Sequence, residues 1–264
     1  MTLTRAALVV VLLHAGARAA LLPRGDSGFA ERGPAITLRK RVHVNTLIAQ
    51  PGTMEIEWGG SFSWNGGFTL PMALHYTTEG RHPWWGRTEF SVAFDSLAHD
   101  SATQFGDRTT FAATCVIYDG DKLDIALAPQ ASLLLRGDSG ARIGATGIVR
   151  YDAGRSSAGV TFTWTGATQS SLSNPADVFD LGAGYGFRLK PSGPLGHLTP
   201  HVNAVYEKAT GTVRQISLFE GMEYQVTDPF ATDFAVQQIA RWGGQPDTQF
   251  VIGITMNTGK RRRR

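Results

Sequence analysis

Apolar and polar residues alternate along most of the chain that follows residue 53. In the first such segment one face is apolar and consists of Met54, Ile56, Trp58, Phe62 and Trp64. The opposite face carries acidic residues, glycine and serine, namely Glu55, Glu57, Gly59, Ser61 and Ser63. A period of two predicts a β-strand with one apolar and one polar face. Comparable segments lie at residues 69–76, 89–95, 111–118, 123–133, 143–151, 160–165, 179–189, 201–207, 216–226, 230–239 and 249–257.

These segments predict about twelve strands of roughly ten residues, the length of a tilted strand that crosses a membrane. A soluble β-sandwich would pack its apolar faces together, whereas a membrane barrel turns them toward lipid and its polar faces toward a lumen. The barrel is favoured by aromatic residues near the strand ends: Trp58, Trp64, Tyr76, Tyr151, Trp164 and Tyr206. We therefore predict an all-β fold, a transmembrane antiparallel up-and-down β-barrel of about 12 strands.

Turn residues separate the predicted strands. Residues 65–67 (Asn-Gly-Gly) are typical of a hairpin, because they tolerate positive φ. Tight turns are predicted at 119–121, 152–154 and 227–229, on the periplasmic side, and longer outward-facing loops at 96–107 and 167–177. The alternation is weakest at residues 109–118 and 216–240, so the strand register stays open there.

The N-terminus has the three parts of a secretory signal peptide. Arg5 precedes the apolar run 6–13, and small residues at 17–19 precede a plausible cleavage site. We predict four regions: a signal peptide at 1–19, an extended leader at 20–51, a barrel at 52–259 and a basic tail at 260–264. Export followed by a barrel predicts the outer membrane as the location.

Composition excludes several other classes of protein. The 264 residues are 42% hydrophobic and 10% aromatic, which argues against intrinsic disorder. No apolar run approaches the roughly 20 residues that a spanning helix needs. The net charge of +3 includes five positive charges of the tail, so the remainder is net negative and no nucleic-acid surface is indicated. The single cysteine, Cys115, cannot form an internal disulfide.

Several short motifs resemble those of a known group of membrane barrels. Residues 43–47 (HVNTL) and 51–60 (PGTMEIEWGG) are similar to the opening of Gram-negative outer-membrane barrels labelled as components of the meta-pathway of phenol degradation. Residues 180–186 (DLGAGYG) and 218–225 (LFEGMEYQ) are similar to later segments of that group. The resemblance implies a transporter-like barrel, with outer-membrane lipid and the barrel-assembly machinery as partners. Such barrels commonly end on an aromatic residue, whereas this one ends at 256–259 (MNTG) before the tail.

The polar faces of the predicted strands supply the residues that would line a lumen. The candidates are Glu55, Glu57, His75, Glu89, Asp95, Asp124, Asp180, Arg188, His201, Asn203, Glu207 and Glu223. Three inward glycines of one strand, Gly182, Gly184 and Gly186, would leave the wall bare. Close backbone packing is one reason for such glycines, and room for a permeant or a plugging segment is another. The excess of acids predicts a preference for cations if the lumen is open.

Motifs for enzymatic chemistry are absent from the sequence, and we expect no cofactor, no metal and no catalytic activity. The favoured function is passive passage or binding of small solutes, apolar or aromatic ones included. The alternative is a secreted soluble β-sandwich that binds or cleaves glycans through Glu55 and Glu57. These carboxylates would lie about 6.5–7 Å apart along a strand, within the roughly 5–9 Å range of glycosidases.

The leader offers one more hypothesis. Arg39, Lys40 and Arg41 stand shortly before a strand whose polar face opens with Glu55 and Glu57. A tethered basic segment is held at high effective concentration near such an acidic wall. The leader is thus either a plug within the lumen or a tail on the periplasmic side.

Overall fold

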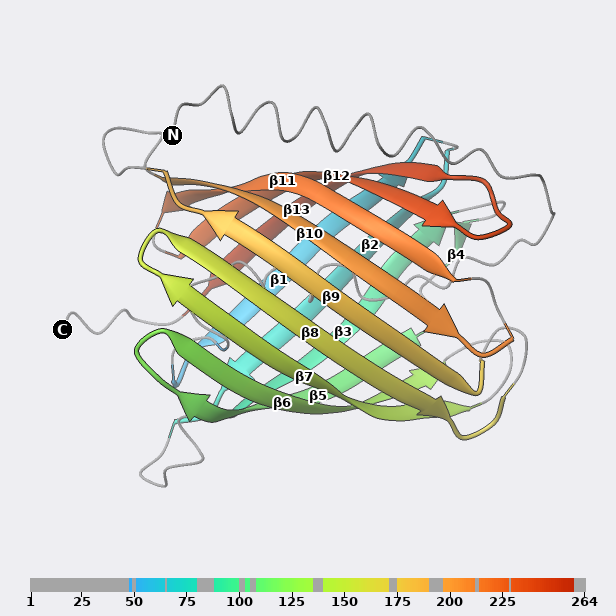
Figure 1. Cartoon of the computed structure of the whole chain (residues 1–264), viewed down its shortest axis with the longest axis horizontal. Coiled ribbons are helices and arrows are strands. Elements are labelled where there is room, and N and C mark those ends of the chain that lie inside the picture. Colours follow the sequence, from blue (N-terminus) through green and yellow to red (C-terminus); the bar gives the residue numbers. More distant parts are fainter. Residues whose placement is uncertain are drawn as a thin grey trace.

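The computed structural model describes residues 48, 51–64, 66–79, 88–99, 103–104, 108–134, 140–170, 175–189, 197–211, 214–227 and 229–258. These residues form a single antiparallel sheet that curls into a barrel (Figure 1). Its twelve long strands are β1 (Met54–Ser63), β2 (Phe68–Thr77), β3 (Thr88–His99), β5 (Arg108–Asp119), β6 (Leu123–Leu134), β7 (Ala141–Ala153), β8 (Ser156–Ala167), β9 (Asp177–Phe187), β10 (Leu198–Ala209), β11 (Gln215–Thr227), β12 (Phe230–Arg241) and β13 (Asp247–Asn257). A two-residue strand, β4 (Thr103–Gln104), pairs only with β3.

The sheet closes because its first and last strands pair with each other. Glu55 lies opposite Asn257 and Ser63 opposite Gln249, while β2 pairs with β3 to continue the ring. Across the β1–β13 pair, the hydroxyl Oγ of Ser63 donates to Oδ1 of Asp247 at 2.8 Å. Each long strand in the described part of the chain therefore has two neighbours. The predicted up-and-down barrel is confirmed, and the alternative of a β-sandwich, which needs two sheets, is wrong.

The two ends of the barrel differ. At one end, which we name the terminal mouth, β1 begins, β13 ends, and short turns join β5 to β6, β7 to β8 and β11 to β12. Glycine makes one of these turns possible, since Gly154 adopts a φ of 70°. The three tight turns predicted from sequence thus lie at one end. At the other end, the distal mouth, the 65–67 turn is closed by a hydrogen bond from the Ser63 amide to the Gly67 carbonyl.

One predicted loop is partly strand. The sequence places a loop at 96–107, yet β3 runs to His99, and Thr103–Gln104 pairs back onto it. The reason lies in the partner strand. Because β2 begins at Phe68, its first residues pair with Leu97, Ala98 and His99 of β3. A register shift between Leu70 and Pro71 absorbs one extra residue of β3 and so permits this extension.

The apolar faces point outward, as predicted. Phe162, in the middle of β8, is 52% exposed, whereas its neighbours Thr161 and Thr163 are buried toward the inside. Aromatic side chains named from the sequence are also exposed on the outside, including Trp58, Trp64, Tyr76, Tyr151 and Trp164. In the described part of the chain, no helix is long and apolar enough to cross a membrane.

Strand β5 explains why residues 111–118 give a weak alternation. Its inward face carries Ala112 and Val116, which are apolar like its outward residues. Val116 joins Ala126 of β6 and Ile148 of β7 in an apolar cluster inside the barrel, and Ile48 packs against that cluster. Part of the inner surface of β5 therefore contacts protein, which removes the need for polar residues at those positions.

Close packing of β7 against β8 makes one glycine necessary. A Cβ atom at Gly144 would lie 2.7 Å from Cα of Thr165 and still closer to the Trp164 carbonyl oxygen. At Gly147, three residues along β7, the nearest atom would lie at 3.9 Å. We expect Gly144→Val to lower the free energy of unfolding by about 1–3 kcal/mol, as overpacking does. Urea unfolding in detergent micelles measures the change, and Gly147→Val is the matched control. Equal losses in both variants would contradict the packing argument.

The lumen wall as candidate functional site

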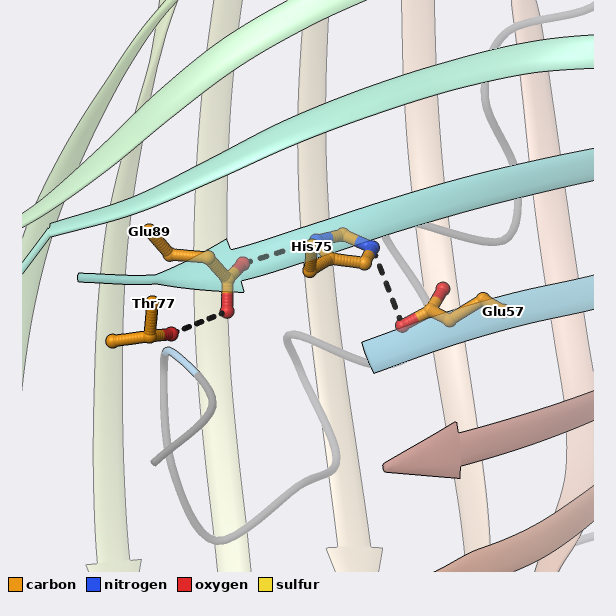
Figure 2. Close-up of polar contacts among 4 residues, drawn as sticks. All are labelled: Glu57, His75, Thr77 and Glu89. Atoms are coloured by element: carbon orange, nitrogen blue, oxygen red, sulfur yellow. Dashed lines mark hydrogen bonds and ion pairs between the residues drawn. The ribbon is translucent and has the colours of Figure 1, made fainter. Parts of the chain in front are cut away.

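A histidine held between two glutamates forms a buried polar group of the inner wall. Figure 2 shows the imidazole of His75 between the carboxylates of Glu57 and Glu89. Nδ1 of His75 lies 3.0 Å from Oε1 of Glu89, and its Nε2 lies 3.6 Å from Oε1 of Glu57. The hydroxyl of Thr77 donates to Oε2 of Glu89 at 3.4 Å. We name Glu57, His75 and Glu89 the carboxylate–imidazole cluster.

Three adjacent strands bring this cluster together. Glu57 belongs to β1, His75 to β2 and Glu89 to β3, and antiparallel pairing places Glu89 opposite Thr77. The three side chains are only 2%, 3% and 3% exposed. Buried charges need partners, because taking an ion out of water costs several kcal/mol. A protonated imidazole would offset one of the two carboxylate charges, so the cluster carries net negative charge in either state.

The other acidic candidates line the wall without forming a common site. Glu55 and Asp180 lie on inward faces, opposite His75 and Thr163 respectively. Asp180 and Glu207 face each other across β9 and β10. Glu223, whose register the sequence leaves open, pairs with Thr199 and Asp233 and points inward. Asp124 lies opposite Arg150.

Two of the candidates, Arg188 and Asp95, are not placed on the inner wall by a described side chain. Arg188, predicted to line the lumen, follows the end of β9 and is exposed, because the strand ends at Phe187 and the chain turns there. Its carbonyl accepts a hydrogen bond from Nε of Arg155 at the terminal mouth. Asp95 lies in the backbone of β3 opposite Pro71, and the structure does not describe its side chain. Residues 39–41, the plug candidates, are also outside the described part of the chain.

The bare wall predicted at Gly182, Gly184 and Gly186 lies between β8 and β10. Gly184 has Gly159 on one side and Asn203 on the other, and Gly186 lies opposite His201. Asn203 is 5% exposed, and neither Oδ1 nor Nδ2 of its amide has a hydrogen-bond partner among the described contacts. Both atoms are shielded from solvent, so the amide is a buried polar group beside the glycines.

Sequence reasoning missed the arginines of the inner wall. Arg142 and Arg150 alternate with outward Ile143 and Val149 on β7, and the same period-two pattern could have located them. The guanidinium of Arg142 donates to the Pro175 carbonyl at 2.7 Å and to Oγ1 of Thr165 at 3.0 Å. Arg150 pairs with Asp152. Each of these arginines thus interacts with neighbouring residues of the protein through hydrogen bonds or an ion pair.

The arrangement does not favour glycan hydrolysis. Glu57, one of the two proposed carboxylates, is engaged with His75, and both Glu55 and Glu57 are buried. A hydrolase of this kind needs a space between its carboxylates that admits a sugar and a water molecule. No group of histidine, cysteine, aspartate or glutamate residues suited to a metal ion occurs among the described residues.

A closed antiparallel barrel of twelve long strands, apolar outside and polar inside, is the fold of the outer-membrane porins. The chain is similar to the KdgM porin, with 12% identity, a TM-score of 0.56 and coverage of 76% of this chain and 98% of that one. It is similar to the NanC porin, with 10% identity, a TM-score of 0.57 and the same coverage. An outer membrane channel from Pseudomonas putida F1 gives 9% identity, a TM-score of 0.57 and coverage of 82% and 98%.

Comparison of sequences does not assign the chain to a family. No protein-family profile and no curated protein matches the chain. The likeness to the three barrels is therefore one of fold, and the phenol-degradation label remains a resemblance of short motifs.

Proposed function

We propose that this protein is an outer-membrane channel that passes small solutes passively. The observation that carries the proposal is the inversion of polarity around one closed wall: large apolar side chains outside, buried polar and charged ones inside. Such a wall suits lipid on one side and hydrated solutes on the other. The shared fold of the KdgM and NanC porins supports the same conclusion.

The charges of the wall favour cations. Inward positions in the described strands carry more acids than arginines: Glu55, Glu57, Glu89, Asp124, Asp152, Asp180, Glu207, Glu223, Asp233 and Asp247 against Arg108, Arg142, Arg150 and Arg241. Moreover, Arg142, Arg150 and Arg241 bond to neighbouring wall residues. Excess negative charge along a pore raises the local concentration of cations and lowers that of anions.

We expect the purified protein to show cation preference in planar bilayers, measured as the reversal potential in a salt gradient. Neutralising the facing pair, Asp180→Asn with Glu207→Gln, should move the permeability ratio of cation to anion toward one, because part of the inward charge is removed. The matched control is Glu220→Gln, a change of the same kind on the outward face of β11, opposite Val202 and Val236. It should leave the ratio unchanged.

Two outcomes of this experiment would count against the proposal. Absence of conductance from correctly folded protein would contradict passive passage. Conductance with a clear anion preference would retain the channel but contradict the role of the inward acids in selecting ions.

We further propose a chemical class for the solute. The resemblance to barrels labelled for phenol degradation supports small aromatic molecules as candidates. Liposome swelling compares such solutes with aliphatic molecules of equal size and charge.

A further inference from the structure

Arg155 is held in place at the terminal mouth, where the β7–β8 turn leads into β8. Its Nε donates to the Arg188 carbonyl at 3.0 Å, and its Cζ lies 4.7 Å from the centre of the Phe187 ring. A guanidinium that is stacked on a ring keeps its planar fork of N–H donors available for a bidentate partner. Arg155 is exposed, so its terminal nitrogens can bind a group that approaches from outside the protein.

The Phe187 ring and a pair of hydroxyl groups place this guanidinium on the outer face of the barrel. Tyr185, two residues before Phe187 on β9, is 46% exposed and shares its face. Ser156 lies opposite Phe187 on β8, and its Oγ lies 3.0 Å from the hydroxyl oxygen of Tyr185. One of these hydroxyls donates to the other, which leaves one O–H that can donate to an external acceptor. We name Arg155, Ser156, Tyr185 and Phe187 the arginine–aromatic patch.

The position of the patch along the strands places it among lipid headgroups. Phe162, on the outer face in the middle of β8, lies six residues after Ser156. At a rise of about 3.3 Å per residue and a strand tilt of about 40°, this separation is about 15 Å along the membrane normal. The apolar band of such barrels is about 25 Å tall, so the patch lies at the edge of the band when Phe162 lies near its middle. Short turns are typical of the periplasmic side, so the terminal mouth belongs to the periplasmic leaflet.

The positive charge of this region is not paired with acids of the barrel. Among the described residues, neither Arg155 nor Arg188 forms an ion pair with an acidic side chain. Asp152, on the inner side of β7, pairs with Arg150 instead. A guanidinium binds a phosphate through two parallel N–H···O bonds, which are roughly twice as strong as neutral hydrogen bonds. A phospholipid supplies such a phosphate at the edge of the apolar band.

We propose that the arginine–aromatic patch binds the headgroup of an anionic phospholipid of the periplasmic leaflet. The guanidinium of Arg155 holds the phosphate, the hydroxyl pair donates one hydrogen bond to it, and Arg188 adds positive charge nearby. The acyl chains extend along the outer faces of β8 and β9, where Val160 and Leu181 are 48% and 50% exposed. The site lies outside the lumen, so it does not depend on which solutes the channel passes.

Native mass spectrometry of the folded protein in a neutral detergent tests the site, with dioleoylphosphatidylglycerol as the added lipid. Arg155→Gln should weaken binding of this lipid about tenfold or more, because it removes the charge-assisted hydrogen bonds. Arg155→Lys keeps the charge but loses the planar fork, so its affinity should lie between those of the other two proteins. The double variant Ser156→Ala with Tyr185→Phe should weaken binding by a smaller factor than Arg155→Gln, because it removes one neutral donor.

Lys122→Gln supplies the matched control, because it removes one positive charge from the exposed β5–β6 turn at the same mouth. It should leave the affinity for the lipid unchanged. Equal weakening by Lys122→Gln and Arg155→Gln would mean general attraction by charge and would overturn the site. Unchanged binding in both Arg155→Gln and the hydroxyl double variant would overturn it as well. Heat-modifiable migration on a gel checks that each variant is folded.

Two further probes test whether the ligand is an anionic lipid. Inorganic phosphate in millimolar excess should not displace bound dioleoylphosphatidylglycerol, because it has no acyl chains to contact β8 and β9. Dioleoylphosphatidylcholine should bind more weakly, because its choline cation is repelled by the two arginines. Displacement by phosphate, or equal binding of the two lipids, would overturn the assignment of the patch to an anionic phospholipid.

Discussion

Replacing Phe162 by arginine should destabilise the folded protein in a bilayer and lower its free energy of unfolding by about 2–4 kcal/mol. Phe162 is the seventh of the twelve residues of β8 and is exposed on the outer face. A guanidinium at this depth lies near the membrane midplane, where neither water nor an acidic partner offsets its charge. Urea unfolding in phospholipid vesicles measures the loss, and heat-modifiable migration checks that the variant still folds.

The neighbouring residue supplies the control for this experiment. Thr163 faces inward, between Thr146 of β7 and Asp180 of β9, so a guanidinium there has an acidic side chain beside it. Thr163→Arg should therefore cost much less than Phe162→Arg. Comparable losses at both positions would contradict the assignment of the outer face to lipid.

Removing the imidazole of the carboxylate–imidazole cluster should have the second large effect. His75→Leu replaces the imidazole by an apolar side chain that fills a similar volume. It leaves Glu57 and Glu89 buried without the histidine that both of them contact. Breaking a buried charge pair by removing one member costs about 3–5 kcal/mol. We expect the free energy of unfolding to fall by that amount in urea titrations followed by tryptophan fluorescence.

A compensating variant separates charge from packing. In the His75→Leu background, Glu57→Gln with Glu89→Gln removes both carboxylate charges and should recover a large part of the lost stability. His75→Gln, which retains a hydrogen-bonding side chain, should lose less than His75→Leu. Failure of the glutamine pair to recover stability would mean that the imidazole acts through packing and not through charge.

The strands can be predicted from the sequence because contact with lipid requires apolar residues at alternate positions. Most outward positions within the bilayer are apolar, so residues such as Ile56, Val92 and Ile254 recur at a period of two. The number of long strands, their faces and most of their turns follow from that requirement. The irregular segment at 216–240 is still recognisable as strands, and it forms β11 and β12.

Contacts between strands are not readable in the same way. Glu57, His75 and Glu89 can each be assigned to an inward face, but their meeting depends on the register of β1, β2 and β3. A ten-residue connection joins β2 to β3 and leaves that register unspecified. The contact of Ile48 is hidden for another reason: the leader has no period, and the first of its partner strands begins 60 residues later, at Arg108.

The pairing of β1 with β13 has a consequence for the order of events in biosynthesis. The first strand of the barrel obtains its second neighbour only when the last strand, which ends at Asn257, has been translated. Until then the growing sheet has two open edges, which can pair with other chains. A chain that lacks β13 therefore keeps both edges open to pairing with its copies. The seam at Glu55–Asn257 and Ser63–Gln249 is thus the contact whose formation removes both open edges.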